Sequence, residues 1–220
     1  MLTHVEKQRH EVHGATPRSH KSAMGQFMTP ATVAEFMAGL FKPRDGEFRL
    51  LDAGAGLGAL TCATLDRWLA GELGRGPMSV EVHELDDRLR VHLEETLEGY
   101  AKQGVQIRVR SGDYLAHAAD EIERERAFFT HAILNPPYKK IGTGSDARVQ
   151  ARRGGLETVN LYSAFVGLAL AQMGTGGQLV AIIPRSFCNG PYYKPFRRFL
   201  LEHATLHHIH LFDSRTQAFK

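Results

Sequence analysis

The chain has 220 residues, a hydrophobic fraction of 43%, a charged fraction of 23% and a formal net charge of +3. These values are ordinary for one globular α/β domain, and the mild positive charge permits nucleic acid as a partner without requiring it. The two cysteines lack C-x-x-C spacing, which favours reduced thiols and a cytoplasmic location. No apolar run approaches the length of a membrane span, so we expect no membrane partner.

The first 24 residues are polar and rich in histidine, and their apolar residues follow no sustained period. We therefore predict a flexible N-terminal arm over residues 1–24 and a catalytic domain over residues 25–220. Thr29 directly precedes Pro30, which is typical of an N-cap followed by proline in the first helical turn. The helical spacing of apolar residues predicts a helix over residues 31–41.

A glycine-rich turn follows the first predicted strand. The apolar run over residues 48–53 predicts a buried strand, and Gly54, Gly56 and Gly58 lead from it into a helix over residues 59–70. Glycine lets backbone N–H groups approach a ligand closely at a helix N-terminus. The pattern is shared by many nucleotide-binding folds, so it indicates a ligand site without naming the ligand.

Polar side chains follow four predicted strands, at residues 48–53, 78–83, 105–110 and 128–134. Helices predicted between these strands give an alternating α/β order, which is typical of an open parallel sheet. The carboxyl ends of such strands lie on one edge of the sheet, where ligands bind. A carboxylate at the second strand end, Glu84, can accept both hydroxyls of a ribose. The side chains that converge there are Asp52, Glu84, Asp113 and Asn135.

The fourth strand ends in Asn135-Pro136-Pro137-Tyr138. Proline has no N–H and a fixed φ, so this backbone is stiff and its carbonyl groups remain free to accept hydrogen bonds. The Asn135 oxygen and the Pro136 carbonyl can accept both N–H bonds of an aromatic amine while Tyr138 stacks on its ring, and adenine is such a group. Acceptors out of the ring plane make the amine nitrogen a better nucleophile and stabilise the charge that develops on it. The alternative is that the prolines only end a strand, with Asn135 capping and Tyr138 packing.

The remainder of the chain is predicted to contain a basic loop, two helices and two strands. Residues 139–157 are rich in glycine, lysine and arginine, and we interpret them as a flap that contacts phosphate, with a solvated loop as the alternative. We predict helices over residues 158–173 and 192–202, and strands over residues 178–183 and 205–212. The carboxyl-terminal histidines lack a third ligand from a fixed neighbour, so we predict no metal site.

Taken in order, these segments resemble the N6-adenine DNA methyltransferases of restriction-modification systems. The resemblance is to the branch in which an N-terminal cofactor motif precedes the glycine-rich loop. It implies a Rossmann-like, S-adenosylmethionine-dependent methyltransferase fold, with a mostly parallel sheet and helices on both faces. The segments that carry the resemblance are Gly25–Pro30, Leu51–Gly56, Glu84, Gly112–Tyr114, Asn135–Tyr138, Leu161–Phe165, Gly177–Pro184 and Phe212–Arg215.

The resemblance also implies a role for each cofactor residue. Thr29 and the Gly54 turn would hold the methionine end of S-adenosylmethionine, and Asp52 would organise that loop. Glu84 would bind the ribose, and Asp113 would accept from the adenine amine, with the following tyrosine against the ring. The residues expected to bind the cofactor are Thr29, Asp52, Gly54, Gly56, Glu84, Asp113 and Tyr114.

The substrate implied by the resemblance is double-stranded DNA with its target adenine flipped out of the helix. Asn135, Pro136 and Tyr138 would be catalytic, and the other expected substrate contacts are Pro137, Lys139, Lys140 and Phe219. The family continues into a final strand and a target-recognition region, which this sequence does not show. We therefore expect either a catalytic fragment or a subunit whose specificity comes from a separate region or subunit.

Other functions fit parts of the sequence. Methylation of a protein glutamine fits the Asn-Pro-Pro-Tyr motif, and methylation of a ribosomal RNA base is a further enzymatic alternative. A nucleotide-binding dehydrogenase would explain the glycine turn and Glu84 but leaves Asn-Pro-Pro-Tyr without a role. A non-catalytic DNA-binding subunit fits the absence of a recognition region.

Overall fold

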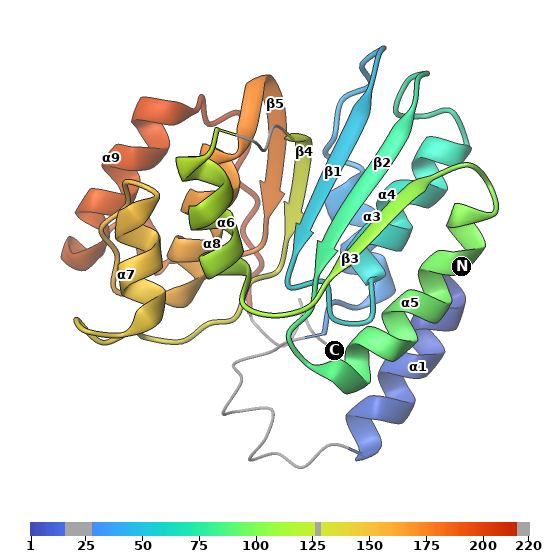
Figure 1. Ribbon diagram of the computed structural model, residues 1–220, viewed down its shortest axis with the longest axis horizontal. Coiled ribbons are helices and arrows are strands. Elements are labelled where there is room, and N and C mark those ends of the chain that lie inside the picture. Colours follow the sequence, from blue (N-terminus) through green and yellow to red (C-terminus); the bar gives the residue numbers. More distant parts are fainter. Residues whose placement is uncertain (16–27, 126–128, 215–220) are drawn as a thin grey trace.

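A parallel sheet forms the centre of the molecule, and the computed structural model describes residues 1–15, 28–125 and 129–214 (Figure 1). The strand order is β3-β2-β1-β4-β5, and every adjacent pair is parallel. The chain adds β2 and β3 on one side of β1 and then adds β4 and β5 on the other side. Sheets of this kind bind ligands at the strand ends where the order switches, here between β1 and β4. The strands are β1 (Phe48–Ala53), β2 (Met78–His83), β3 (Gln106–Arg110), β4 (Phe129–Leu134) and β5 (Met173–Ala181).

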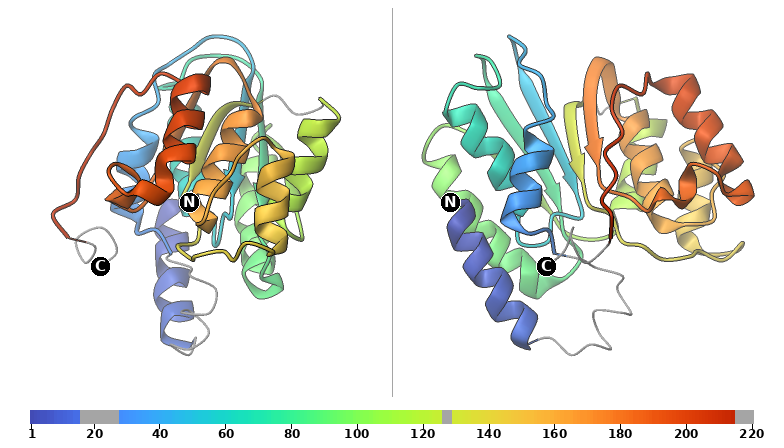
Figure 2. Two further views of the ribbon diagram at one scale, coloured as in Figure 1. Left: turned by 90° about the vertical axis from the view of Figure 1, so that its left-hand side faces the viewer. Right: turned by 180° about the vertical axis from the view of Figure 1, so that it is seen from behind.

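Helices cover both faces of the sheet (Figure 2). Helices α1, α3, α4 and α5 lie on one face and α6, α7 and α8 on the other, while α9 packs against α8 beside β5. The helices are α1 (Leu2–Ala15), α3 (Ala31–Ala38), α4 (Ala59–Leu69), α5 (Asp87–Ala101), α6 (Tyr114–Glu123), α7 (Asp146–Arg153), α8 (Leu161–Ala171) and α9 (Lys194–His203), with 3-10 turns at η1 (Arg185–Phe187) and η2 (Pro191–Tyr193).

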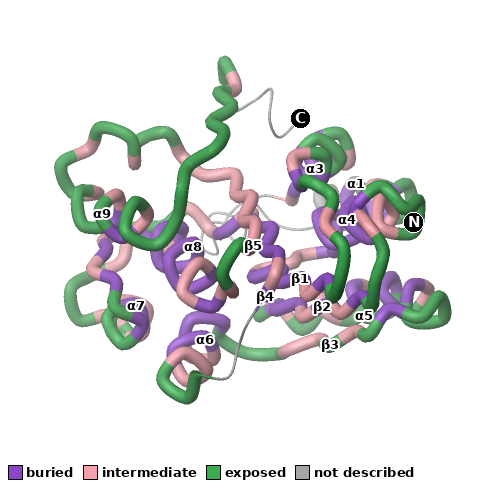
Figure 3. Tube along the Cα trace, turned by 90° about the horizontal axis from the view of Figure 1, so that it is seen from above, coloured by how far each residue is buried: buried purple, intermediate pink, exposed green. Residues whose placement is uncertain are grey.

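The alternation of side chains along the strands builds a separate apolar cluster on each face. In β1, Phe48 and Leu50 contribute to the cluster under α3, α4 and α5, whereas Leu51 and Ala53 contribute to the cluster under α6 and α8. Figure 3 shows buried backbone running through β4 and α8, and an exposed segment after α9. A sheet that is buried on both faces leaves only its edges and strand ends for function.

The structure confirms the predicted α/β fold. Strands β1 and β2 have the predicted bounds, and the predicted helix over residues 59–70 is α4, one residue shorter. The fourth strand begins at Phe129, and Phe128 lies outside the described residues. No helix in the described part of the chain is both long and apolar enough to cross a membrane.

The predicted flexible arm is wrong for residues 2–15, which form α1. Leu2 and Val5 are buried in the apolar cluster beside α3, α4 and α5. Glu6 forms an ion pair with Arg9 at 2.6 Å and accepts a hydrogen bond at 3.0 Å from the backbone N–H of Ala31. The helix is therefore stabilised by tertiary contacts, which a search for apolar periodicity does not detect. The rest of the expected arm, residues 16–24, lies outside the described residues.

The predicted strand over residues 205–212 is also wrong. The segment is extended, but it pairs with no strand in the described part of the chain. Leu206, Ile209 and Leu211 are each more than half exposed, at 59%, 53% and 65%. Phe212 packs against the apolar cluster on the α3 face, and the ring of His210 lies 4.7 Å from that of Phe36. The alternating apolar pattern predicts a strand, but without a neighbouring strand to pair with the segment does not become part of the sheet.

The predicted loop over residues 139–157 contains a helix, α7. Its arginines form ion pairs within the chain: Arg148 and Arg152 contact Glu157 at 2.5 and 2.6 Å. Arg153 contacts Asp120 at 2.7 Å and Glu123 at 2.6 Å. These three arginines are therefore already paired within the chain, while phosphate contact by the segment stays a prediction.

Candidate functional site

A cavity of about 330 Å³ lies at the carboxyl ends of the strands. This volume is in the range of pockets that enclose a cofactor or a similar small molecule. The convergence of strand ends predicted from the sequence is confirmed for Glu84, Asp113 and Asn135. Nine predicted site residues line the cavity: Thr29, Gly54, Gly56, Glu84, Asp113, Tyr114, Asn135, Pro137 and Lys139.

Four other predicted residues do not line this cavity: Asp52, Pro136, Tyr138 and Lys140. Phe219 lies outside the described residues. Lys140 is exposed and its backbone forms an isolated bridge with Asn160.

The glycine turn and Glu84 form one continuous wall. Gly54 and Gly56 have φ values of +82° and +59°, which favour glycine. The Gly56 N–H donates to one carboxylate oxygen of Glu84 at 2.8 Å, and the Asp86 N–H donates to the other at 2.7 Å. Burial raises the pKa of Glu84, although these backbone donors oppose the shift. The carboxylate is therefore fixed in orientation at the cavity surface.

Asp52 supports the turn from beneath. Its side chain is fully buried, and Oδ2 accepts a hydrogen bond from the Thr61 hydroxyl at 2.6 Å. The other oxygen, Oδ1, has no hydrogen-bond partner in the described part of the chain. Burial, followed by the nearby charge of Glu84, raises the pKa of Asp52 to about 7, against the hydrogen bond from Thr61. This hydrogen bond links the end of β1 to the first turn of α4.

The third strand end places an acid and an aromatic ring beside each other. Asp113 is the N-cap of α6, and its Oδ1 accepts from the N–H of Leu115 at 2.9 Å. The Tyr114 ring is buried, and its hydroxyl donates to Gln172 at 2.9 Å. The ring lies 5.1 Å from that of Phe165. Both Asp113 and Tyr114 line the cavity, so an acceptor and an aromatic side chain lie next to each other in its wall.

The Asn-Pro-Pro-Tyr corner is held by hydrogen bonds from two sides. Asn135 donates from Nδ2 to the Thr29 hydroxyl at 3.0 Å, and the Tyr138 hydroxyl lies 3.0 Å from Asn135 Oδ1. That hydroxyl also lies 2.9 Å from the backbone oxygen of Ile182. A phenol has one proton, so it donates to only one of these acceptors at a time. The Asn135 oxygen is therefore oriented by its neighbours rather than free to rotate.

The structure corrects the predicted cap of α3. The N-cap is Pro30, which makes no side-chain capping bond, and Thr29 instead accepts from Asn135. The capping acceptor comes from α1, because Glu6 accepts from the N–H of Ala31. By contrast, α5 is capped by the residue that directly precedes it, since the Asp86 side chain accepts from the N–H of Arg88 at 3.0 Å.

A match to a family model places these features in context. Residues 66–219 match the Eco57I restriction-modification methylase model, and this segment is more than half of the chain. The chain belongs to the Eco57I restriction-modification methylase family.

Members of restriction-modification systems are among the similar proteins. The chain is 45% identical over 212 residues to the type II methyltransferase M.BsuBI of Bacillus subtilis, covering 91% of this chain and 42% of that protein. It is 38% identical over 224 residues to the type II methyltransferase M.PstI of Providencia stuartii, and the match covers 98% of this chain and 44% of that protein. The chain thus spans less than half the length of these curated relatives.

The fold of this Eco57I-family chain is similar to that of solved methyltransferases. A putative class I S-adenosylmethionine-dependent methyltransferase from Listeria monocytogenes superimposes with a TM-score of 0.60 at 15% identity. The match covers 80% of this chain and 52% of that one. This similarity identifies the Rossmann-like methyltransferase fold that the sequence predicted.

Sequence reasoning missed Arg9 and His83 in the cavity wall of this family member. His83 directly precedes Glu84 at the end of β2. Its place beside a predicted ligand-binding acid could have indicated that it lies in the cavity wall. Arg9 gave none, because only tertiary contacts bring α1 to the cavity.

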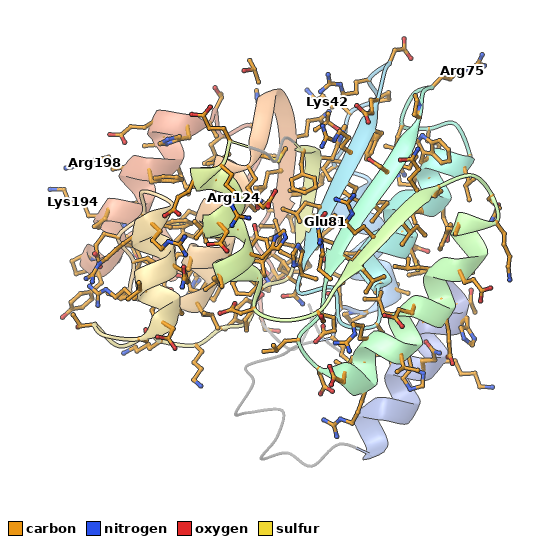
Figure 4. The ribbon with its side chains drawn as sticks, viewed as in Figure 1. Lys42, Arg75, Glu81, Arg124, Lys194 and Arg198 are labelled. Atoms are coloured by element: carbon orange, nitrogen blue, oxygen red, sulfur yellow. The ribbon has the colours of Figure 1, made fainter. Side chains whose placement is uncertain are left out.

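A charged cluster lies behind His83. The Nε2 atom of His83 is 3.1 Å from a carboxylate oxygen of Glu81. Glu81, His83 and His117 each offer one atom that could bind a metal ion, and these atoms lie within 4.8 Å of one another. Arg108 and Arg110 contact the Glu81 carboxylate at 3.3 and 3.5 Å. Burial alone would raise the pKa of Glu81, but His83 and Arg110 outweigh it and lower the pKa to about 2. Figure 4 labels Glu81 near strands β1 and β2. Because its carboxylate is paired with His83, Arg108 and Arg110, we interpret it as support for β2 rather than as a metal ligand.

Proposed function

We propose that this chain transfers a methyl group from S-adenosylmethionine to N6 of adenine in DNA, and that the target adenine is flipped into the Asn135 corner. The membership of the Eco57I family and the names of the relatives support methylation in a restriction-modification system. The observation that carries the choice of an amine is the fixed amide of Asn135 at the cavity wall.

The cavity fits the proposed methyl donor. Gly54 and Gly56 would contact its methionine end, and Glu84 would accept from the ribose hydroxyls with the lone pairs that its backbone donors leave free. The free oxygen of Asp113 would accept from the adenine amine, and Tyr114 would lie against the ring. When bound, S-adenosylmethionine supplies an electrophilic methyl group on a sulfonium.

The corner after β4 is suited to make an aromatic amine nucleophilic. An amide oxygen can accept two hydrogen bonds, so the Asn135 oxygen would accept the incoming N–H beside, or in place of, its bond with Tyr138, whose proton can turn toward the Ile182 oxygen. With the Pro136 carbonyl as second acceptor, N6 would be held with its lone pair directed at the methyl group. The N–C bond would form as the S–C bond of the donor breaks, S-adenosylhomocysteine would be released, and the proton lost from N6 would pass to water. Positioning supplies most of the rate enhancement.

The proposed catalytic domain comprises residues 25–220 together with α1, because Arg9 lines the cavity. Pro137, Lys139 and Lys140 are the proposed contacts to the DNA, and they border the corner on its exposed side. A separate specificity region or subunit is the proposed partner that selects the DNA sequence.

The test is methyl transfer from radiolabelled S-adenosylmethionine to DNA, tRNA and a release-factor protein, followed by analysis of nucleosides and amino acids. We expect label in N6-methyladenine from DNA. We expect Asn135→Ala to lower the transfer rate by at least about 100-fold and to leave donor affinity, measured separately by calorimetry, nearly unchanged. Label only in RNA or in protein would contradict the proposal.

A further inference from the structure

Helix α1 contributes a buried arginine to the wall of the cavity. Arg9 is 8% exposed and lines the cavity together with Val5 from the same helix. Its Nε donates to Glu6 at 3.0 and 3.1 Å, and its Nη2 donates to Glu6 at 2.6 Å. Among the described residues, Nη1 has no acceptor. Arginine carries five N–H donors, so this pairing leaves part of the guanidinium available.

Glu6 fixes the place of this arginine. Its carboxylate also accepts from the N–H of Ala31 at 3.0 Å, at the start of α3. The residues just before this point, Met28 and Thr29, line the cavity as well. Arg9 is therefore held on the side of the cavity that carries Thr29, which is hydrogen-bonded to Asn135.

The charges that line the cavity are unevenly distributed. Its carboxylates within the described chain are Glu84 and Asp113, at the ends of β2 and β3. Arg9 and Lys139 are its lysine and arginine side chains, and Lys139 is largely exposed. An anionic group of a bound small molecule would therefore be attracted to Arg9 and repelled by the two acids.

We propose that Arg9 binds the carboxylate of the methionine portion of the methyl donor, an inference that rests on the proposed function. Nη1 donates to the carboxylate, while Glu6 holds the guanidinium plane in position. Helix α1 is then part of the donor site rather than an appendage. The alternative is that the Arg9–Glu6 pair only attaches α1 to α3.

Two ligands separate these roles. S-adenosylhomocysteine carries the carboxylate, whereas 5′-methylthioadenosine has the same nucleoside and sulfur without it. Their affinities are measured by calorimetry on the full chain for the wild type, Arg9→Met and Arg9→Lys. Methionine keeps an apolar stem of similar length, so packing of α1 is preserved. Arg67→Met is the matched control, because Arg67 forms an ion pair with Glu72 at 2.9 Å and does not line the cavity.

For Arg9→Met we expect affinity for S-adenosylhomocysteine to fall about 10- to 100-fold, with affinity for 5′-methylthioadenosine within about twofold. Arg9→Lys should lose less, and Arg67→Met should change neither. Equal losses for both ligands, or no loss for S-adenosylhomocysteine, would overturn the assignment. A wild-type chain that binds neither ligand would refute the proposed donor, and this inference with it.

A second variant covers the case in which Arg9→Met does not fold. Glu6→Gln keeps an oxygen for the Ala31 N–H but removes the charge that competes for Arg9. We expect it to bind S-adenosylhomocysteine several-fold more tightly, on the order of 3- to 10-fold, and 5′-methylthioadenosine unchanged. An unchanged ratio between the two ligands would overturn the proposal.

Discussion

The side-chain nitrogen of Asn135 donates to the hydroxyl oxygen of Thr29 at 3.0 Å, across 106 residues of sequence. This bond fixes which end of the amide faces which neighbour, so the oxygen is directed to the side where Tyr138 lies. It also joins the segment that precedes α3 to the end of β4. The proposed donor site and the proposed acceptor site therefore share a hydrogen bond.

Thr29→Val should slow methyl transfer more than it weakens donor binding. Valine has a similar shape but offers no acceptor, so the Asn135 amide can rotate and its oxygen is no longer held. We expect the transfer rate to fall about 10- to 100-fold, because misplacement of one group by a small distance is costly. Single-turnover kinetics measures the rate. Thr32→Val, on the exposed side of α3, is the control and should behave as the wild type.

Tyr138→Phe should have a smaller effect. Its ring would still pack edge-on against Tyr162, whose centroid lies 6.2 Å away, but the hydroxyl that links Asn135 to Ile182 would be absent. We expect a loss of about tenfold in transfer rate and no change in donor affinity. Tyr192→Phe, at a residue that is 75% exposed, serves as the control. A rate equal to the wild type would show that the hydroxyl does not position the amide.

Local patterns predicted the centre of the fold, and tertiary contacts decided the rest. Strands β1, β2 and β4 and the glycine turn were predictable, because buried apolar runs and closely spaced glycines leave direct signals in the sequence. The predicted cap at Thr29 was wrong because Glu6, far away in sequence, supplies the acceptor for α3. Helix α7 was missed because its polar surface is stabilised by ion pairs rather than by an apolar face.

Gly58→Ala should destabilise the fold more than Gly71→Ala. Both glycines have positive φ values, +85° and +76°, so alanine at either costs about 1 kcal/mol in backbone conformation. At Gly58 the added Cβ would also lie 2.7 Å from a Leu93 methyl group, whereas nothing lies within 4 Å at Gly71. Overpacking of this kind adds about 1–3 kcal/mol. Urea denaturation measures the free energy of unfolding of both variants. Equal losses of this free energy would contradict the predicted overpacking at Gly58.

Asp52 should make the protein more stable at mildly acidic pH. Its pKa of about 7 in the fold exceeds the value of 3.8 expected for an exposed side chain. The stabilisation from its bound proton is therefore complete below pH 3.8 and is lost as the pH rises through 7. Between pH 5 and 7.5 the change is about 2–3 kcal/mol. Asp52→Asn should remove this contribution from urea unfolding curves, and Asp87→Asn, on the exposed side of α5, should not.

His131 should make the protein less stable as the pH falls, which is the opposite of the effect expected for Asp52. It is fully buried and stacked on Phe48, and burial followed by the charge of Arg44 lowers its pKa to about 4, from 6.5. The unfolded chain then binds a proton more readily, so stability is complete above pH 6.5 and is lost as the pH falls toward 4. The loss between pH 7.5 and 5 is about 2 kcal/mol. In His131→Phe the free energy of unfolding should fall less on acidification than in the wild type. His207→Gln, in the exposed segment after α9, should keep the wild-type dependence, and an unchanged dependence in His131→Phe would contradict the assignment.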